Sequence, residues 1–268
     1  MPETAPSLLL VGGPTALISY GGLRLLTDPT FDPPGDHPRP GTPVVLHKLT
    51  SPRVFAAVLE PIDAVLLSHD HHSDNLDPAG RAFLPRAGRV LTTVAGAERL
   101  EVEATGMEPD DSTRMEAPNG AGVEITAVRA DHGPPEVAPK NGPVIGFLLS
   151  AEGLPSVYVS GDNASVDVVR AIVDVHGPID SSVLFCGGAV VPEVWGPDAY
   201  LTLTPEMAVE AARLLGDGPI VPIHQEGWAH FSFGPEELEQ AFGEAGLADR
   251  LRPVSPGEEV PLSQDGSG

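Results

Sequence analysis

The sequence has few of the residue types that several classes of protein require. Cys186 is the single cysteine among 268 residues, so an internal disulfide and a zinc site built from cysteines are both excluded. Lysine and arginine total 15 against 38 acidic residues. The resulting net charge of −23 disfavours nucleic acid and anionic membranes as partners. Aromatic residues make up 5% of the chain, so aliphatic side chains have to form most of the core.

Long apolar runs are also lacking. No segment approaches the roughly 20 apolar residues that a membrane-spanning helix needs. The first residues, Met1 to Ser7, lack the basic start and apolar stretch of a signal peptide. We therefore expect a cytoplasmic protein with no membrane partner. The hydrophobic content of 41% is enough for one sizeable core, and the sequence leaves a homo-oligomer open.

Apolar runs bounded by glycine and proline predict a strand-rich chain. Residues 31–43 are rich in proline, glycine and aspartate and predict a loop. Strands are expected over 8–11, 16–20, 23–27, 64–67, 89–93, 123–129, 144–149, 157–160, 182–185 and 220–223. Helices are expected over 52–59, 95–104, 166–175, 205–215 and 235–242. The order of strands and then strands alternating with helices occurs roughly twice, with no linker between the halves. This order predicts an α/β domain over 1–262, with two packed sheets and outer helices, and a disordered tail over 263–268.

The densest polar cluster follows the buried strand expected at 64–67. His69, His71, His72 and two carboxylates, Asp70 and Asp74, lie within six residues. Groups crowded in this way repel one another unless a cation binds them, and neutral imidazole is a ligand for zinc, iron and manganese. The alternative is a polar loop with solvated histidines.

Three further polar residues follow other predicted strands. His132, Asp162 and His224 each stand just after a strand. A lone histidine in such a position is more often structural. Strand ends at one edge of a sheet can converge in space, however, so the repeated pattern favours a shared metal site.

Together these segments resemble the metallo-β-lactamase superfamily, and within it the ascorbate-6-phosphate lactonase-like branch of metal-dependent hydrolases. The matching segments are 21–29, 67–71, 131–133, 158–162, 187–188, 204–210 and 220–224. The resemblance implies a four-layer αββα sandwich, the metallo-β-lactamase fold, with a site for one or two Zn²⁺ ions or for Mn²⁺ or Fe²⁺ in their place. It implies that His69, His71 and His132 bind the first metal, Asp162 bridges both, and Asp74 and His224 hold the second. Asp74, Asp162 and His224 are on this basis also the expected catalytic residues.

One departure from the family pattern affects the second metal. The family reads His-x-His-x-Asp-His, whereas here one extra residue lies between His71 and Asp74, and Asn75 stands at the final histidine position. A neutral amide is a weaker ligand for a transition metal. His72 is a potential replacement for the missing imidazole, but the insertion leaves its direction open.

The function that the resemblance implies is hydrolysis of a small-molecule ester, lactone or amide by a metal-bound hydroxide. The alternatives are phosphodiesterase or nuclease chemistry on the same fold, and a catalytically degenerate metal-binding member. Few basic residues argue against phosphate substrates. For substrate contacts we expect Trp195, Tyr200, Trp228 and His230, each of which has a packing role as its alternative.

Overall fold

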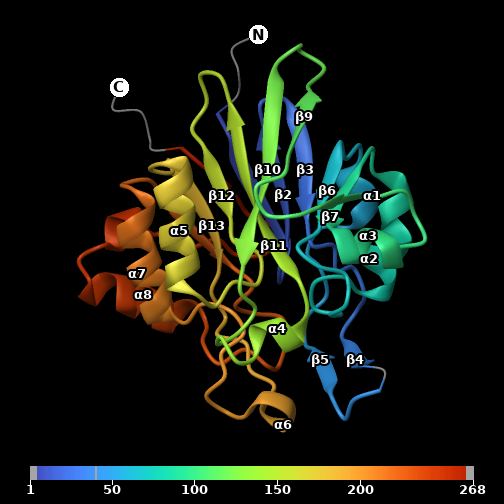
Figure 1. Cartoon of the computed structure of the whole chain (residues 1–268), viewed down its shortest axis with the longest axis vertical. Coiled ribbons are helices and arrows are strands. Elements are labelled where there is room, and N and C mark those ends of the chain that lie inside the picture. The colour runs from blue at the N-terminus through green and yellow to red at the C-terminus, as the bar shows by residue number, and fades with distance from the viewer. Residues whose placement is uncertain (1–4, 40, 264–268) are drawn as a thin grey trace.

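The computed structural model describes residues 5–39 and 41–263, and most of its strands form two sheets that pack face to face (Figure 1). The first sheet runs in the order β15 (Glu259–Pro261), β1 (Ser7–Gly12), β2 (Thr15–Tyr20), β3 (Leu23–Thr27), β6 (Ala64–Leu66), β7 (Val90–Thr93) and β8 (Thr105–Met107). The second runs in the order β14 (Ile220–Ile223), β13 (Ser181–Phe185), β12 (Val157–Val159), β11 (Val144–Ala151), β10 (Gly122–Ala130) and β9 (Ser112–Glu116). A separate hairpin pairs β4 (Gly35–Pro38) with β5 (Val45–Lys48).

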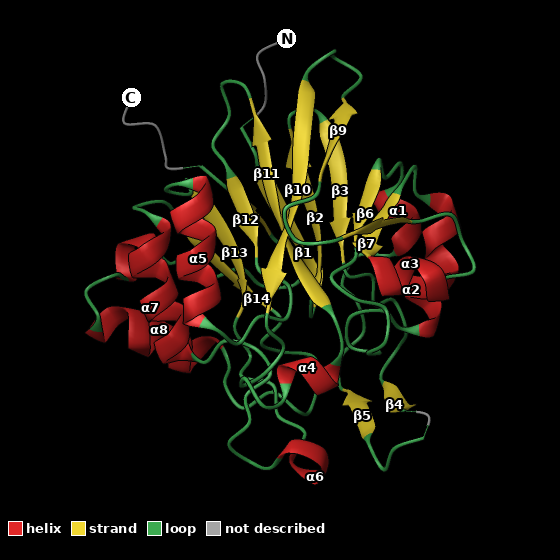
Figure 2. Cartoon of the chain, viewed as in Figure 1, coloured by secondary structure: helices red, strands yellow, loops and turns green. Residues whose placement is uncertain are grey.

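Helices cover the outer face of each sheet (Figure 2). The helices are α1 (Ala56–Leu59), α2 (Pro78–Phe83), α3 (Val94–Arg99), α4 (Ala138–Asn141), α5 (Val166–His176), α6 (Pro192–Trp195), α7 (Pro205–Leu215) and α8 (Pro235–Glu244), with 3₁₀ turns η1 (Leu84–Arg86) and η2 (Ala248–Arg250). Helices α1 to α3 lie beside the first sheet, and α5, α7 and α8 lie against the second. The resulting order of layers is helix, sheet, sheet, helix, which confirms the predicted αββα sandwich.

The alternation of side chains along the strands produces these layers. In β2, Ile18 and Tyr20 enter the core between the two sheets, whereas Leu17 packs on the helix side. In β13, Phe185 points between the sheets and Leu184 points toward the helices. Each sheet is thus apolar on both faces, as a sheet covered on both sides must be.

Several short elements differ from the sequence expectation. Strands β8, β9 and β15 were not expected, and the predicted loop over 31–43 contains β4. The helix expected over 95–104 ends at Arg99, and that expected over 52–59 is reduced to the four residues of α1. The tail residues 264–268 lie outside the described part of the chain. No helix in that described part is both long and apolar enough to cross a bilayer.

One end of the sandwich carries the longest connections. The β4–β5 hairpin, α4 and α6 gather there with the loops that follow β6, β10, β12 and β14 (Figure 1). All the polar residues predicted for the site are on these connections or next to them.

Candidate metal centre

Polar residues from four strand ends meet at this end of the sandwich. His69 follows β6, His132 follows β10, Asp162 follows β12, and His224 follows β14. Among the described residues, groups able to hold a cation are His69 with His132 and Asp162, and Asp74 with Asp162 and His224; a third group is His69 with His71 and His72. Asp162 belongs to the first two groups, so its carboxylate lies between two potential metal positions.

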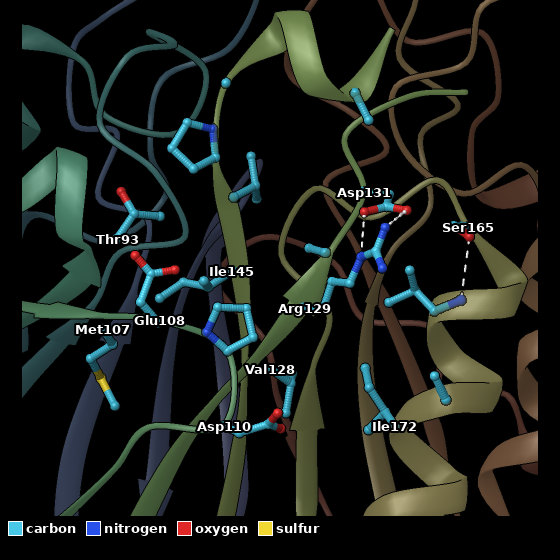
Figure 3. Close-up of a pocket in the computed structure, with 18 of the residues that line it drawn as sticks. Thr93, Met107, Glu108, Asp110, Val128, Arg129, Asp131, Ile145, Ser165 and Ile172 are labelled. Carbon is cyan, nitrogen blue, oxygen red and sulfur yellow. Dashed lines mark hydrogen bonds and ion pairs between the residues drawn. The ribbon is translucent and has the colours of Figure 1, made fainter. Parts of the chain in front are cut away.

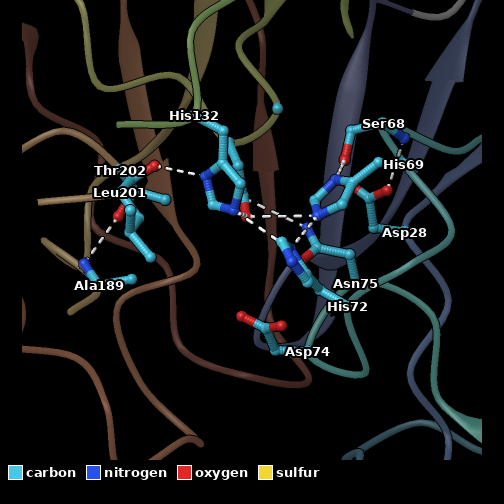
Figure 4. Close-up of polar contacts among 12 residues, drawn as sticks. Asp28, Ser68, His69, His72, Asp74, Asn75, His132, Ala189, Leu201 and Thr202 are labelled. Atoms are coloured by element: carbon cyan, nitrogen blue, oxygen red, sulfur yellow. Dashed lines mark hydrogen bonds and ion pairs between the residues drawn. The ribbon is translucent and has the colours of Figure 1, made fainter. Parts of the chain in front are cut away.

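Three imidazole nitrogens converge in the first group (Figure 4). His72 Nδ1 lies 2.9 Å from His69 Nε2 and 3.2 Å from His132 Nε2. Asp162 Oδ2 is 3.6 Å from His132 Nε2 and 3.9 Å from His69 Nε2. Ligands of a tetrahedral zinc at about 2.0–2.1 Å stand roughly 3.3 Å apart. These four atoms therefore have the spacing of a zinc ligand set.

The opposite nitrogens of two of these rings are held by neighbouring oxygens. His132 Nδ1 lies 2.7 Å from the carbonyl oxygen of Leu201 and donates its proton to it. His69 Nδ1 lies 2.9 Å from the hydroxyl oxygen of Ser68. Such contacts fix the ring orientation and leave Nε2 as the lone pair that faces the centre.

The second group is built around one oxygen of Asp74. Asp74 Oδ2 lies 3.6 Å from His224 Nε2 and 2.9 Å from His230 Nε2. His224 Nε2 is also 3.4 Å from Asp162 Oδ1. His224 has a φ of 55°, in the left-handed region, and its backbone amide donates to the carbonyl of Gly13 at 3.0 Å. A non-glycine residue held there costs free energy, which is typical of functional sites.

Several buried atoms of the cluster make no hydrogen bond within residues 5–39 and 41–263. They include Asp162 Oδ2, both ring nitrogens of His224 and Nε2 of His72. Buried polar atoms almost always have a partner, so each of these requires an explanation. Ligation of a cation explains two of them, Asp162 Oδ2 and His224 Nε2, which face the other potential ligands. The donor set therefore fits one or two divalent metals.

The shifted pKa values of the cluster also fit a bound cation. Burial lowers the pKa of His69 and His72 well below the usual value and lowers that of His132 to about 4. Burial, with the carboxylates of Asp74 and Asp28, raises the pKa of Asp162 well above its ordinary value. The imidazoles are therefore neutral and free to bind a metal, whereas the carboxyl group of Asp162 is costly to ionise without a partner. A bound cation stabilises the ionised form of Asp162.

Asn75 and Asp28 form hydrogen bonds with residues of the cluster. Asn75 is fully buried and its Nδ2 donates to Asp162 Oδ1 at 3.2 Å. Asp28 Oδ1 accepts from the backbone amide of Ser68 at 2.7 Å, directly before His69. Burial raises the pKa of Asp28 to about 8.

His71 lies at the edge of this centre. Its Nε2 is 2.8 Å from the carbonyl oxygen of Asn141, and its ring is 4.7 Å from that of His69. His72, not His71, supplies the nitrogen between His69 and His132. The role of His71 as a ligand of the first metal, which the resemblance implies, stays a prediction, since His71 also forms a group with His69 and His72 that is able to hold a cation.

The residues expected to contact substrate fall into two pairs. Trp195 and His230 line a cavity of about 60 Å³ above the cluster. Its apolar wall consists of Val44, Leu46, Ala189, Val191, Trp195 and Leu201. Tyr200 packs on Phe233 instead, and Trp228 is buried beneath Lys48. Among the described residues that line the cavity, Arg39 is the only lysine or arginine.

A larger hollow lies elsewhere. A groove of about 1000 Å³ runs between α3 and α5 over β10 and β11 (Figure 3). Its wall includes the ion pair of Arg129 with Asp131, in which Nε and Oδ1 are 2.8 Å apart. No histidine cluster faces it within the described residues, so the small cavity rather than the large groove holds the reactive groups.

Known proteins resemble the chain over most of its length. The model of the family described as β-lactamase superfamily domain matches residues 23–225. A protein of Rubrobacter xylanophilus named a metal-dependent hydrolase is 28% identical over 255 residues, which cover 91% of each chain. Among solved structures, an isothiocyanate hydrolase from Delia radicum gut bacteria has a TM-score of 0.79 at 20% identity, covering 96% of this chain and 100% of its own. A possible metal-dependent hydrolase from Veillonella parvula has a TM-score of 0.78 at 14% identity, covering 97% and 100%.

Proposed function

Because the chain belongs to the β-lactamase superfamily domain family, we propose that it is a metal-dependent hydrolase of a small-molecule ester, lactone or amide. One observation supports this proposal most strongly. Nitrogens of His69, His72 and His132 converge on one point beside a buried carboxylate of Asp162 that accepts no hydrogen bond at Oδ2 within the described chain.

The chain's own groups divide into ligands and supports. His69, His72, His132 and Asp162 would hold a first ion, and Asp74, Asp162 and His224 a second. A divalent cation bound there lowers the pKa of a coordinated water toward neutrality and polarises a carbonyl oxygen. The orienting contacts from Ser68 and Leu201 keep the imidazole lone pairs aimed at the centre.

The cavity supports a small, largely apolar substrate. Its volume of about 60 Å³ admits only a compact reacting group, and aliphatic residues with Trp195 form its wall. Arg39 supplies a single positive charge at this wall. Phosphodiesters are usually held by several cationic or bidentate contacts, so one arginine supports an acyl substrate better.

Metal analysis combined with substrate hydrolysis tests the proposal. Purified protein should contain divalent metal by elemental analysis, and it should hydrolyse generic esters or lactones faster than phosphodiesters. Chelation should abolish hydrolysis, and added zinc or manganese should restore it. Asp162→Asn should lose both metal and activity, whereas Asp174→Asn, the same change at an exposed position of α5, should keep both. Full hydrolysis by the chelated protein would refute the proposal.

A further inference from the structure

We propose that His230 is a ligand of the second metal position, where it takes the place of the imidazole that Asn75 does not provide. This inference rests on the proposed metal-dependent function. It assigns to His230 a role in metal binding in place of the substrate contact expected from the sequence.

The first argument is the position of the His230 ring. His230 Nε2 lies 2.9 Å from Asp74 Oδ2, the same oxygen that faces His224 Nε2 at 3.6 Å. One oxygen of Asp74 therefore faces an imidazole nitrogen of His230 and an imidazole nitrogen of His224. The side chain of His230 is 11% exposed, so its ring lies mostly inside the cavity wall.

The second argument is the chemistry at Asn75. Its Nδ2 donates to Asp162 Oδ1 at 3.2 Å, so the group that faces the shared carboxylate is an N–H donor with no lone pair to offer a metal. Without His230, the second position would have only Asp74, Asp162 and His224 as ligands. With His230, it gains a second imidazole and reaches the four ligands that zinc prefers.

The third argument is that the backbone holds His230 in place. The carbonyl of His230 accepts from the amide of Val190 at 2.9 Å, and the preceding Ala229 donates to the carbonyl of His47 at 3.0 Å. The next residue, Phe231, forms an isolated bridge with Ala189. The ring is thus presented from a segment tied on both sides, as the ring of a preorganised ligand must be.

A hydrogen-bonding role is the rival explanation for the same contact. If His230 only donated its Nε2 proton to Asp74, it would be a positioning residue, and a glutamine amide could replace it. If it binds metal, glutamine should not replace it, but an imidazole at position 75 or free imidazole in solution should. The two roles therefore predict opposite results for matched variants.

The experiment measures zinc and cobalt binding by the full chain. Wild type and His47→Ala, which alters an exposed histidine of the hairpin, should each bind two ions in calorimetry and elemental analysis. His230→Ala and His230→Gln should keep the first ion and bind the second more weakly, beyond the 10–100-fold loss typical of an outer partner. Free imidazole, or Asn75→His in the His230→Ala background, should restore the second ion. The ligand-field spectrum of the second cobalt should change when His230 is removed.

The outcomes separate this inference from the proposed function. Two ions bound with unchanged affinity by His230→Ala or by His230→Gln would overturn the ligand role of His230 and leave the metal-dependent function intact. A single ion in wild type would also overturn it. No metal in wild type would overturn the proposed function itself. Retention of the first ion by both His230 variants is the evidence that they are folded.

Discussion

Replacing Asp28 by asparagine should flatten the pH dependence of stability in the metal-free protein. The carboxyl group of Asp28 is 1% exposed, and burial raises its pKa from 3.8 to about 8. Asparagine has nearly the same shape, and its amide oxygen can accept the hydrogen bond from the Ser68 amide. Asp28 also has a φ of 28°, which asparagine tolerates better than most residues. The variant therefore mimics the protonated carboxyl group.

The direction in which stability changes with pH follows from the pKa values of Asp28 in the folded and unfolded states. Between 3.8 and about 8 the folded state holds a proton that the unfolded chain has released. Stability therefore falls as the pH rises through this window. One pKa unit corresponds to about 1.36 kcal/mol. Wild type should lose roughly 3 to 4 kcal/mol more than Asp28→Asn between about pH 5 and pH 8.

Urea unfolding with chelator present measures this difference. The free energy of unfolding of both proteins is determined at several pH values from about 5 to 8. Titrating groups far from Asp28 contribute equally in the two proteins and cancel in the difference, whereas the carboxyl group of Asp162, whose pKa the charge of Asp28 raises, contributes to the difference that is measured. Parallel curves for wild type and Asp28→Asn would refute the reasoning, because they would show that the carboxyl group of Asp28 has the same pKa in the folded and unfolded states.

Two further substitutions test separate parts of the structure. His72→Ala should reduce the zinc content more than His71→Ala, because only the His72 nitrogen lies between His69 and His132; equal zinc contents in elemental analysis would contradict this placement. Lys48→Met should lower the free energy of unfolding by about 3 to 5 kcal/mol, because it leaves the fully buried carboxylate of Asp77 without the Lys48 ammonium now 2.8 Å away. A urea midpoint unchanged from wild type would show that backbone amides alone satisfy Asp77.

The sequence contained enough information to predict the layers of the fold. Polar residues or glycines follow soon after apolar runs such as 64–67 and 182–185, and this change in residue type indicates where the strands end. Helix α7 was also predictable, because Thr204 caps it and Pro205 begins it, and Thr204 Oγ1 accepts from the Met207 amide at 3.3 Å. These signals are local, so they are readable without knowledge of the partners.

The missed strands lack such local signals. Strand β9 pairs with β10 but has only one apolar residue, Met115, among its five, and β8 is three residues long at the edge of the first sheet. Strand β15 forms only because Glu259–Pro261 lies beside β1, more than 240 residues earlier in the chain. Pairing over such distances is determined by the tertiary fold, and short edge strands have little intrinsic preference of their own.

The position of the His72 ring between His69 and His132 could not be predicted for a similar reason. Two residues of spacing place side chains on one side only while the chain stays extended. Beyond β6 the chain turns, since the amides of Asn75 and Leu76 both bond to the carbonyl of His72. Ring direction in such a turn depends on contacts from other segments, here with Asn141 for His71 and with His132 for His72.

The three buried carboxyl groups of the centre explain why a cation belongs there. Burial raises the pKa of both Asp28 and Asp162, and their mutual repulsion with Asp74 adds to this effect. Burial opposes ionisation of Asp74 too, but His230 and His224 outweigh it and hold its pKa well below the ordinary value. Asp74 therefore already carries the charge that makes its neighbours costly to ionise. A divalent cation between Asp74 and Asp162 reverses this relation, because each carboxylate then stabilises the bound state instead of destabilising the other.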